Sequence, residues 1–166
     1  SLLSTVLDHV VSNLDVDGGG ITLLHHHGTE MKLAFHRGIP PALAEELDRL
    51  RPGEGLIGGV VASGRPRMSV NMQQDRRCGV PAAARDGWRA FQAVPLVAEE
   101  TCVGVLFVFV RGYRVLNQHE LRLLQVVGQQ VGPLIKNAEL FDELQWQQRL
   151  NQASLRELER SRASLR

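Results

Sequence analysis

Three consecutive histidines, His25, His26 and His27, are the side chains of this chain best suited to bind a metal. On a strand, alternate residues share a face. His25 and His27 could therefore bind a divalent cation if His36 supplied a third ligand from a paired strand. No carboxylate or cysteine completes such a set in the sequence pattern. We interpret the run as the polar end of a strand at a hairpin, and predict no metal.

Cys78 is the side chain that could act as a nucleophile or a redox sensor. It follows Asp75, Arg76 and Arg77, and two neighbouring cations could lower the pKa of its thiol. We favour the other interpretation of this segment, an exposed loop with an inert thiol. Cys102 begins an apolar segment and is expected to be a small core residue. Two cysteines are too few for a disulfide framework.

No other pattern in the sequence indicates catalysis. Gly53-Glu54-Gly55 lacks the Lys-Ser/Thr of a phosphate-binding loop and is typical of a turn. No Ser/His/Asp or Cys/His set has motif support, and Glu45 and Glu46 are expected on a helix surface. We predict no catalytic residue, and keep a small thiol-dependent reductase using Cys78 as an alternative.

Composition excludes several classes of partner. The chain has 166 residues, a formal net charge of +1 and 5% aromatic residues. Neither a basic surface for nucleic acid nor an aromatic platform for single strands is expected from these values. No apolar run reaches the ~20 residues that span a bilayer. We expect a soluble, cytoplasmic protein with no nucleic-acid partner and no membrane segment within this chain.

The glycines and prolines divide the chain into two parts, because all of them precede Asn137. Gln, Glu, Arg and Leu dominate the remainder, which is a helix-forming composition. Asn117 and Glu120 have the spacing of a capping box, and therefore predict a helix that begins beside them. We place the boundary between a mixed body, residues 1–138, and a helical tail, residues 139–166.

Hydrophobic periodicity predicts an α+β body. A helix covers the apolar positions from Leu2 to Leu14, and the run Asp17–Gly20 is expected to stop it. Two hairpins and several short helices follow. The predicted strands are 21–25, 31–35, 68–70, 89–97 and 102–110, and the predicted helices between them are 40–50, 56–64 and a turn at 82–86. Pro95 removes a ladder donor and predicts a bulge or an open position there in its strand.

The tail carries apolar and polar residues at alternating steps of three and four, which predicts a coiled-coil seam. The seam residues are Phe141, Leu144, Gln148, Asn151, Leu155, Leu158, Arg162 and Leu165. Its polar members weaken the seam while fixing its register. We predict a parallel homodimer; the alternatives are an amphipathic helix folded on its own body and a frayed end.

The order of these motifs resembles that of a GAF domain, a small-molecule sensor module of signalling proteins. The likeness is carried by Gly19-Gly20-Ile21-Thr22-Leu23-Leu24, Pro52-Gly53-Glu54-Gly55-Leu56-Ile57-Gly58, Ala93-Val94-Pro95-Leu96-Val97, Val103-Gly104-Val105-Leu106 and the segment from Gln129 to Phe141. It implies a GAF/PAS-like six-stranded antiparallel sheet, with the first and last helices bundled on one face. An insert around residues 55–88 would enclose a ligand pocket on the other face.

The resemblance also places residues near that pocket. The implied apolar lining is Phe35, Met68, Val70, Cys78, Trp88 and Phe91. Arg76, Arg77 or Arg89 could then contact an anionic group of a ligand. In the alternative interpretation, Trp88 and Phe91 only fill the core and the pocket is collapsed.

Known ligand types of the family can be compared with this sequence. Bilin-binding members attach the pigment through a cysteine usually followed by His, whereas Gly79 follows Cys78 and Val103 follows Cys102. The Asn-Lys…Phe…Asp-Glu signature of cyclic-nucleotide binding is missing. Relatives that reduce free methionine sulfoxide need several cysteines around the pocket. No covalent bilin is therefore expected, and the ligand stays unnamed.

The function that the resemblance implies is that of a sensory domain in a multidomain signalling protein, most plausibly a sensor histidine kinase. A diguanylate cyclase or a phosphatase is also possible as the output. The domain would form a homodimer through its first and last helices and act without catalysis of its own. A ligand-free dimerisation module is the alternative from another functional class.

Overall fold

The structure, a computed structural model, describes residues 1–164, apart from the side chains at positions 139, 141–143, 163 and 164. It divides into two compact units, residues 1–133 and the remainder of the chain from Leu134. The first unit contains the sheet. The second consists of the later turns of the last helix.

The first unit is built on one antiparallel sheet of five strands in the order β2-β1-β5-β4-β3. The strands are β1 (Gly18–His25), β2 (Glu30–Arg37), β3 (Arg67–Ser69), β4 (Ala90–Ala98) and β5 (Thr101–Val110). The predicted α+β class is confirmed. The strand count corrects the six that the family resemblance implied, since the described part of the chain forms five.

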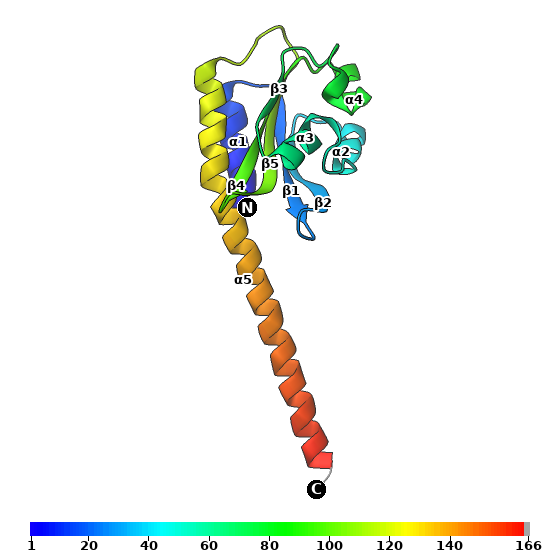
Figure 1. Cartoon of the computed structure of the whole chain (residues 1–166), viewed down its shortest axis with the longest axis vertical. Coiled ribbons are helices and arrows are strands. Elements are labelled where there is room, and N and C mark those ends of the chain that lie inside the picture. The colour runs from blue at the N-terminus through cyan, green and yellow to red at the C-terminus, as the bar shows by residue number, and fades with distance from the viewer. Residues whose placement is uncertain (165–166) are drawn as a thin grey trace. The chain divides into compact units, whose positions relative to one another are not determined.

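Helices cover both faces of the sheet (Figure 1). On one face lie α1 (Leu2–Leu14) and, within the first unit, residues 118–133 of α5 (Gln118–Ser164). On the other face lie α2 (Pro41–Asp48), α3 (Gly55–Ser63) and α4 (Pro81–Arg85), with a short 3-10 turn, η1 (Arg76–Cys78). The insert predicted between residues 55 and 88 thus covers the face away from α1.

The run Gly18–Gly20 begins β1 instead of stopping the first helix, which corrects the sequence-based prediction. Asp15, in a left-handed conformation with φ 51°, ends α1. A Cβ at Gly18 would lie 2.6 Å from the Phe109 ring, and one at Gly20 would lie 2.5 Å from the Phe107 ring. The glycines therefore leave room for two aromatic side chains of β5. Without that room, β1 could not lie beside β5 in the observed register.

Two local sequence patterns, the capping box before α5 and the proline in β4, correspond to features of the structure. Asn117 and Glu120 form both bonds of the predicted capping box: the Asn117 N–H donates to Glu120 Oε1 at 3.0 Å and the Glu120 N–H to Asn117 Oδ1 at 2.8 Å. The irregularity predicted at Pro95 lies one residue later, between Leu96 and Val97.

The backbones of α5 and β4 touch directly. A Cβ at Gly128 would lie 2.6 Å from the Pro95 carbonyl oxygen, and one at Gly132 would lie 2.1 Å from the Val97 carbonyl oxygen. No side chain separates the helix from the irregular part of the strand at these positions. The position of α5 is therefore set directly by the backbone of β4 at these two glycines.

This contact predicts the effect of Gly132→Ala. The added methyl forces α5 away from β4, and overpacking of this kind typically costs about 1–3 kcal/mol of unfolding free energy. Gly112→Ala is the control, because a Cβ there would meet no atom within 4 Å. Urea unfolding measures both variants, and equal stability of the two would contradict the contact.

Candidate functional site

The face of the sheet beneath α2, α3 and α4 is filled by aromatic rings. Trp88 is fully buried and stacks on Phe109, with ring centroids 3.9 Å apart and planes 9° apart. Phe91 lies 6.1 Å from Trp88, and Phe107 lies 5.8 Å from Phe91. Three of these four rings come from the β4–β5 hairpin and the fourth, Trp88, lies just before it, so the hairpin and its entry supply the core.

The space left between these rings and the helices is a cavity of about 10 Å³. Its lining consists of Leu47, Leu50, Leu56, Ile57, Met72, Cys78, Val80, Ala83, Trp88 and Phe91. A single water molecule needs about this volume. The core is therefore closed in this structure, as in the collapsed-pocket interpretation.

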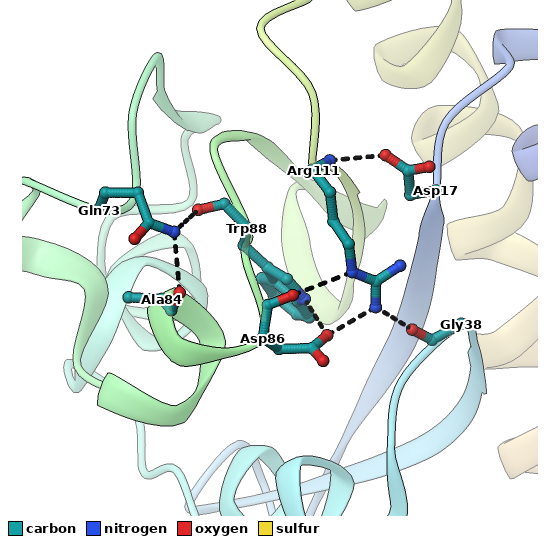
Figure 2. Close-up of polar contacts among 7 residues, drawn as sticks. All are labelled: Asp17, Gly38, Gln73, Ala84, Asp86, Trp88 and Arg111. Carbon is teal, nitrogen blue, oxygen red and sulfur yellow. Dashed lines mark hydrogen bonds and ion pairs between the residues drawn. The ribbon is translucent and has the colours of Figure 1, made fainter.

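Asp86 and Arg111 hold Trp88 in place, and we call their contacts the Asp86–Arg111 latch (Figure 2). The Trp88 indole N–H donates to the Asp86 carboxylate at 3.1 Å, and Arg111 Nη2 donates to the same oxygen at 2.6 Å. Arg111 Nη2 also donates to the Gly38 carbonyl at 2.8 Å, and the Arg111 backbone N–H to Asp17. The latch joins the ends of four segments around the closed core.

Gln73, in the segment between β3 and η1, also holds the backbone around Trp88. Its side-chain amide donates to the carbonyl oxygens of Ala84 and Trp88, both at 2.8 Å (Figure 2). The end of α4 and the start of β4 are therefore tied on two sides. Asp86, Arg111 and Gln73 were missed by sequence reasoning, because bonds between residues up to 94 apart leave no local pattern.

The structure brings together three of the six side chains placed near the pocket by resemblance. Cys78, Trp88 and Phe91 line the closed cavity. Met68 and Val70 do not; they are 40% and 64% exposed, and Met72 lies in the cavity lining in their place.

Phe35 points to the opposite face of the sheet. The pairs Ile21–Phe35 and Thr22–Leu33 leave Ala34 as an extra residue of β2, so Leu33 and Phe35 point to opposite faces. Arg37, two residues after Phe35, bonds to Ser4 and Asp8 of α1, which identifies that face. Phe35 therefore lies on the side of α1, away from the cavity.

Two of the three predicted arginines lie together, at a cleft of about 310 Å³ outside the core. The cleft is lined by Gly53, Gly55, Leu56, Gly59, Arg67, Arg76, Arg77 and Gly79. Arg89 is elsewhere, with its guanidinium 4.2 Å above the Tyr113 ring. Arg67 was not singled out from the sequence, because its position depends on how β3 lies beside α3.

The environment of Cys78 does not activate its thiol. Burial raises the pKa of Cys78, and the negative charge of Asp75 adds to the rise, although a hydrogen bond to the Val80 carbonyl at 3.2 Å opposes it. Arg76 and Arg77 do not lower this pKa as the redox-sensor alternative requires, and Arg77 is paired with Asp75 at 2.7 Å. Burial also raises the pKa of Cys102.

The histidine run lies at the β1–β2 hairpin, where His26 and His27 adopt left-handed conformations at φ 52° and 58°. All three side chains are exposed, and His26 lies 3.2 Å from Glu30. Among residues 1–164, no three His, Cys, Asp or Glu side chains gather closely enough to hold a metal ion.

The seam residues of the tail are exposed where the structure describes them. Leu144, Leu155 and Leu158 are 59%, 59% and 58% exposed. Gln148 and Asn151 are exposed as well. The Phe141 side chain and Leu165 lie outside the described residues. Within the described part of the chain, no helix is both long and apolar enough to cross a membrane.

A family model described as the GAF domain matches residues 1–136, which is most of the chain. The chain belongs to the GAF domain family. GAF domains are typically sensory, small-molecule-binding regulatory domains. No curated protein matches this sequence.

Solved structures share the fold of this GAF domain. One is the GAF domain of a phosphoenolpyruvate-protein phosphotransferase from Coxiella burnetii, with TM-score 0.75, 18% identity, 85% of this chain and 84% of that chain covered. Another is a domain from Sinorhizobium meliloti 1021 assigned to a two-component sensor histidine kinase, with TM-score 0.67, 20% identity, 82% of this chain and 89% of that chain covered. At these identities the likeness concerns the fold alone.

The latch predicts that Arg111→Lys destabilises the domain. Lysine keeps the charge but cannot bond Asp86 and Gly38 with a planar fork. Because the Arg111 guanidinium is partly exposed, the expected loss is about 1–2 kcal/mol of unfolding free energy. Arg85→Lys, at the exposed end of α4, is the matched control. Equal urea midpoints for both variants would show that the latch does not stabilise the fold.

The raised pKa of Cys78 predicts a slowly reacting thiol. In a Cys102→Ser variant, iodoacetamide should alkylate Cys78 more slowly at pH 7.5 than it alkylates glutathione. The rate should rise with pH to an apparent pKa above that of free cysteine, about 8.5. An apparent pKa below that value would contradict the account and favour the reductase alternative.

Proposed function

We propose that this GAF domain is the small-molecule sensor of a cytoplasmic, multidomain signalling protein of the sensor histidine kinase type. It works as a homodimer through α1 and α5 and passes its signal along the tail without a catalytic step of its own. The domain assigned to a two-component sensor histidine kinase, which shares this fold, supports the choice of output.

The observation that carries this proposal is the row of exposed leucines on the tail. Leu144, Leu155 and Leu158 recur at coiled-coil spacing on α5 and are uncovered in the single chain. A second copy in parallel register would cover them and would set Asn151 against Asn151, which fixes register. Exposed Leu2 on α1 and Leu123 and Val126 on α5 would extend the contact onto the first unit.

The route of the signal follows β4. One face of the strand carries Phe91 in the lining of the core cavity. The carbonyl oxygens of Pro95 and Val97 in the same strand approach the backbone of α5 at Gly128 and Gly132. A ligand that favours one position of β4 would therefore bias α5. Such coupling requires that the ligand bind the two helix arrangements with different affinity.

A ligand-free dimerisation module is the second candidate, and the filled core favours it. A cavity of about 10 Å³ holds no metabolite, so the domain could serve only to position the tail. Both candidates predict the same coiled coil. They differ in whether any small molecule binds.

The coiled coil predicts that seam leucines are needed for association. Leu155→Ser with Leu158→Ser should weaken the dimer in sedimentation velocity by at least tenfold in Kd, because two buried leucines are lost from each chain. Leu150→Ser is the matched control, since Leu150 is 49% exposed but lies off the seam.

Truncation after Ala138 gives an independent check of the same interface. The truncated chain should associate more weakly than the full chain, because it lacks the entire tail seam. Equal association of the two chains would contradict the coiled coil. A loss of association with Leu150→Ser as large as that with the seam variant would contradict the assigned seam.

A further inference from the structure

The cleft beside α3 is open where the core is closed. It lies among α3, β3 and η1 and has a volume of about 310 Å³. Pockets for small molecules begin at about 300 Å³. A single small metabolite fits this volume, whereas a dinucleotide or a peptide is too large.

Backbone forms part of the cleft wall. Gly55 and Gly79 both have positive φ, 64° and 72°, and a Cβ at Gly79 would lie 2.5 Å from the Gly55 Cα. The first turn of α3 and the end of η1 are therefore in direct contact through glycines. The first N–H groups of a helix have no intrahelical acceptor, so this wall can donate hydrogen bonds.

Three arginines, one on β3 and two on η1, complete the cleft lining. Arg77 is held by Asp75, through Nη2 at 2.7 Å and Nε at 3.0 Å, and its own Nη2 donates to the Met68 carbonyl. Arg67 on β3 and Arg76 on η1 form no ion pair with any residue that the structure describes. Asp75 offsets Arg77, and exposed Glu54 is not part of the lining, so the cleft retains excess positive charge.

We propose that this cleft binds a small multivalent anion, a di- or tricarboxylate or a phosphorylated metabolite. Arg67 and Arg76 would bind its charged groups in the bidentate manner of guanidinium with carboxylate or phosphate. The backbone at Gly55 and Leu56 would donate to the remaining oxygens, and Arg77 stays with Asp75 as a fixed wall. The proposal names the ligand class of the sensory role proposed above and rests on it for its biological meaning.

The cleft is connected to the strand that touches α5. Leu56 lines both the cleft and the core cavity. β3, which carries Arg67, pairs with β4 through Ser69 and Phe91. An anion held between Arg67 and Arg76 would draw β3 and η1 together beside α3, and the change would reach β4 without any opening of the aromatic core.

The test is calorimetric titration of the full chain with citrate and, separately, with pyrophosphate, at constant ionic strength set by sodium chloride. Saturable binding of at least one anion is expected. Arg67→Gln with Arg76→Gln should raise Kd by about tenfold or more, the usual effect of losing charge-assisted hydrogen bonds. Arg65→Gln with Arg85→Gln removes the same charge outside the cleft and should change Kd less than twofold. A citrate response without a pyrophosphate response would assign the site to carboxylates, and the reverse to phosphates.

A second variant tests the location without changing charge. A Cβ at Gly59 would meet only the Arg67 side chain, at 3.8 Å, so Gly59→Leu is tolerated by the helix and fills the cleft. It should leave the melting temperature unchanged or higher and abolish most of the binding. Unchanged affinity in this variant, equal loss in the control pair, or no saturable binding of either anion would overturn the proposal.

Sedimentation of the same samples separates this inference from the proposed function. If the anion binds through Arg67 and Arg76 while the seam variant leaves association unchanged, the anion site is supported and the proposed signalling through a dimeric tail is contradicted. If the seam is needed for association but neither anion binds, the dimeric coiled coil is supported and the anion site is contradicted.

Discussion

The stacking of Trp88 on Phe109 is the contact on which the first unit depends. It requires β1 to begin with glycines, because any side chain at Gly18 or Gly20 would occupy the space of the β5 rings. It also requires the Asp86–Arg111 latch, which satisfies the only polar atom of the indole inside the core. With the ring in place, α2, α3 and α4 close over the sheet and leave room for about one water molecule.

A closed core changes where a GAF domain of this sequence can meet a ligand. The aromatic rings leave no room for a metabolite unless Trp88 moves, whereas the arginine-lined cleft is accessible without such a change. Phe91 of β4 lines the cavity, and Arg67 of β3, the strand paired with β4, lines the cleft. β4 in turn meets α5 through backbone at Gly128 and Gly132. A ligand bound at either place would therefore reach α5 through β4, under the sensory role proposed above.

Sequence reasoning succeeded where the determining contacts are local. The capping box at Asn117 and Glu120 depends on residues three apart, and the hairpins depend on alternation, so both were predictable. It failed where chain segments far apart decide the outcome. The run Gly18–Gly20 was read as a helix stop because its partners, the rings of Phe107 and Phe109, lie on a distant strand. The family resemblance places Phe35 near the pocket, but one extra residue, Ala34, turns its side chain to the other face of the sheet.

The most direct test of the closed core is the exchange rate of the Trp88 indole N–H with solvent, measured by NMR on the full chain. Trp146 is 59% exposed and supplies an internal reference in the same sample. Burial and the bond to Asp86 predict that the Trp88 indole proton exchanges far more slowly than that of Trp146. Equally fast exchange of the two protons would show that the core is open and that the account is wrong.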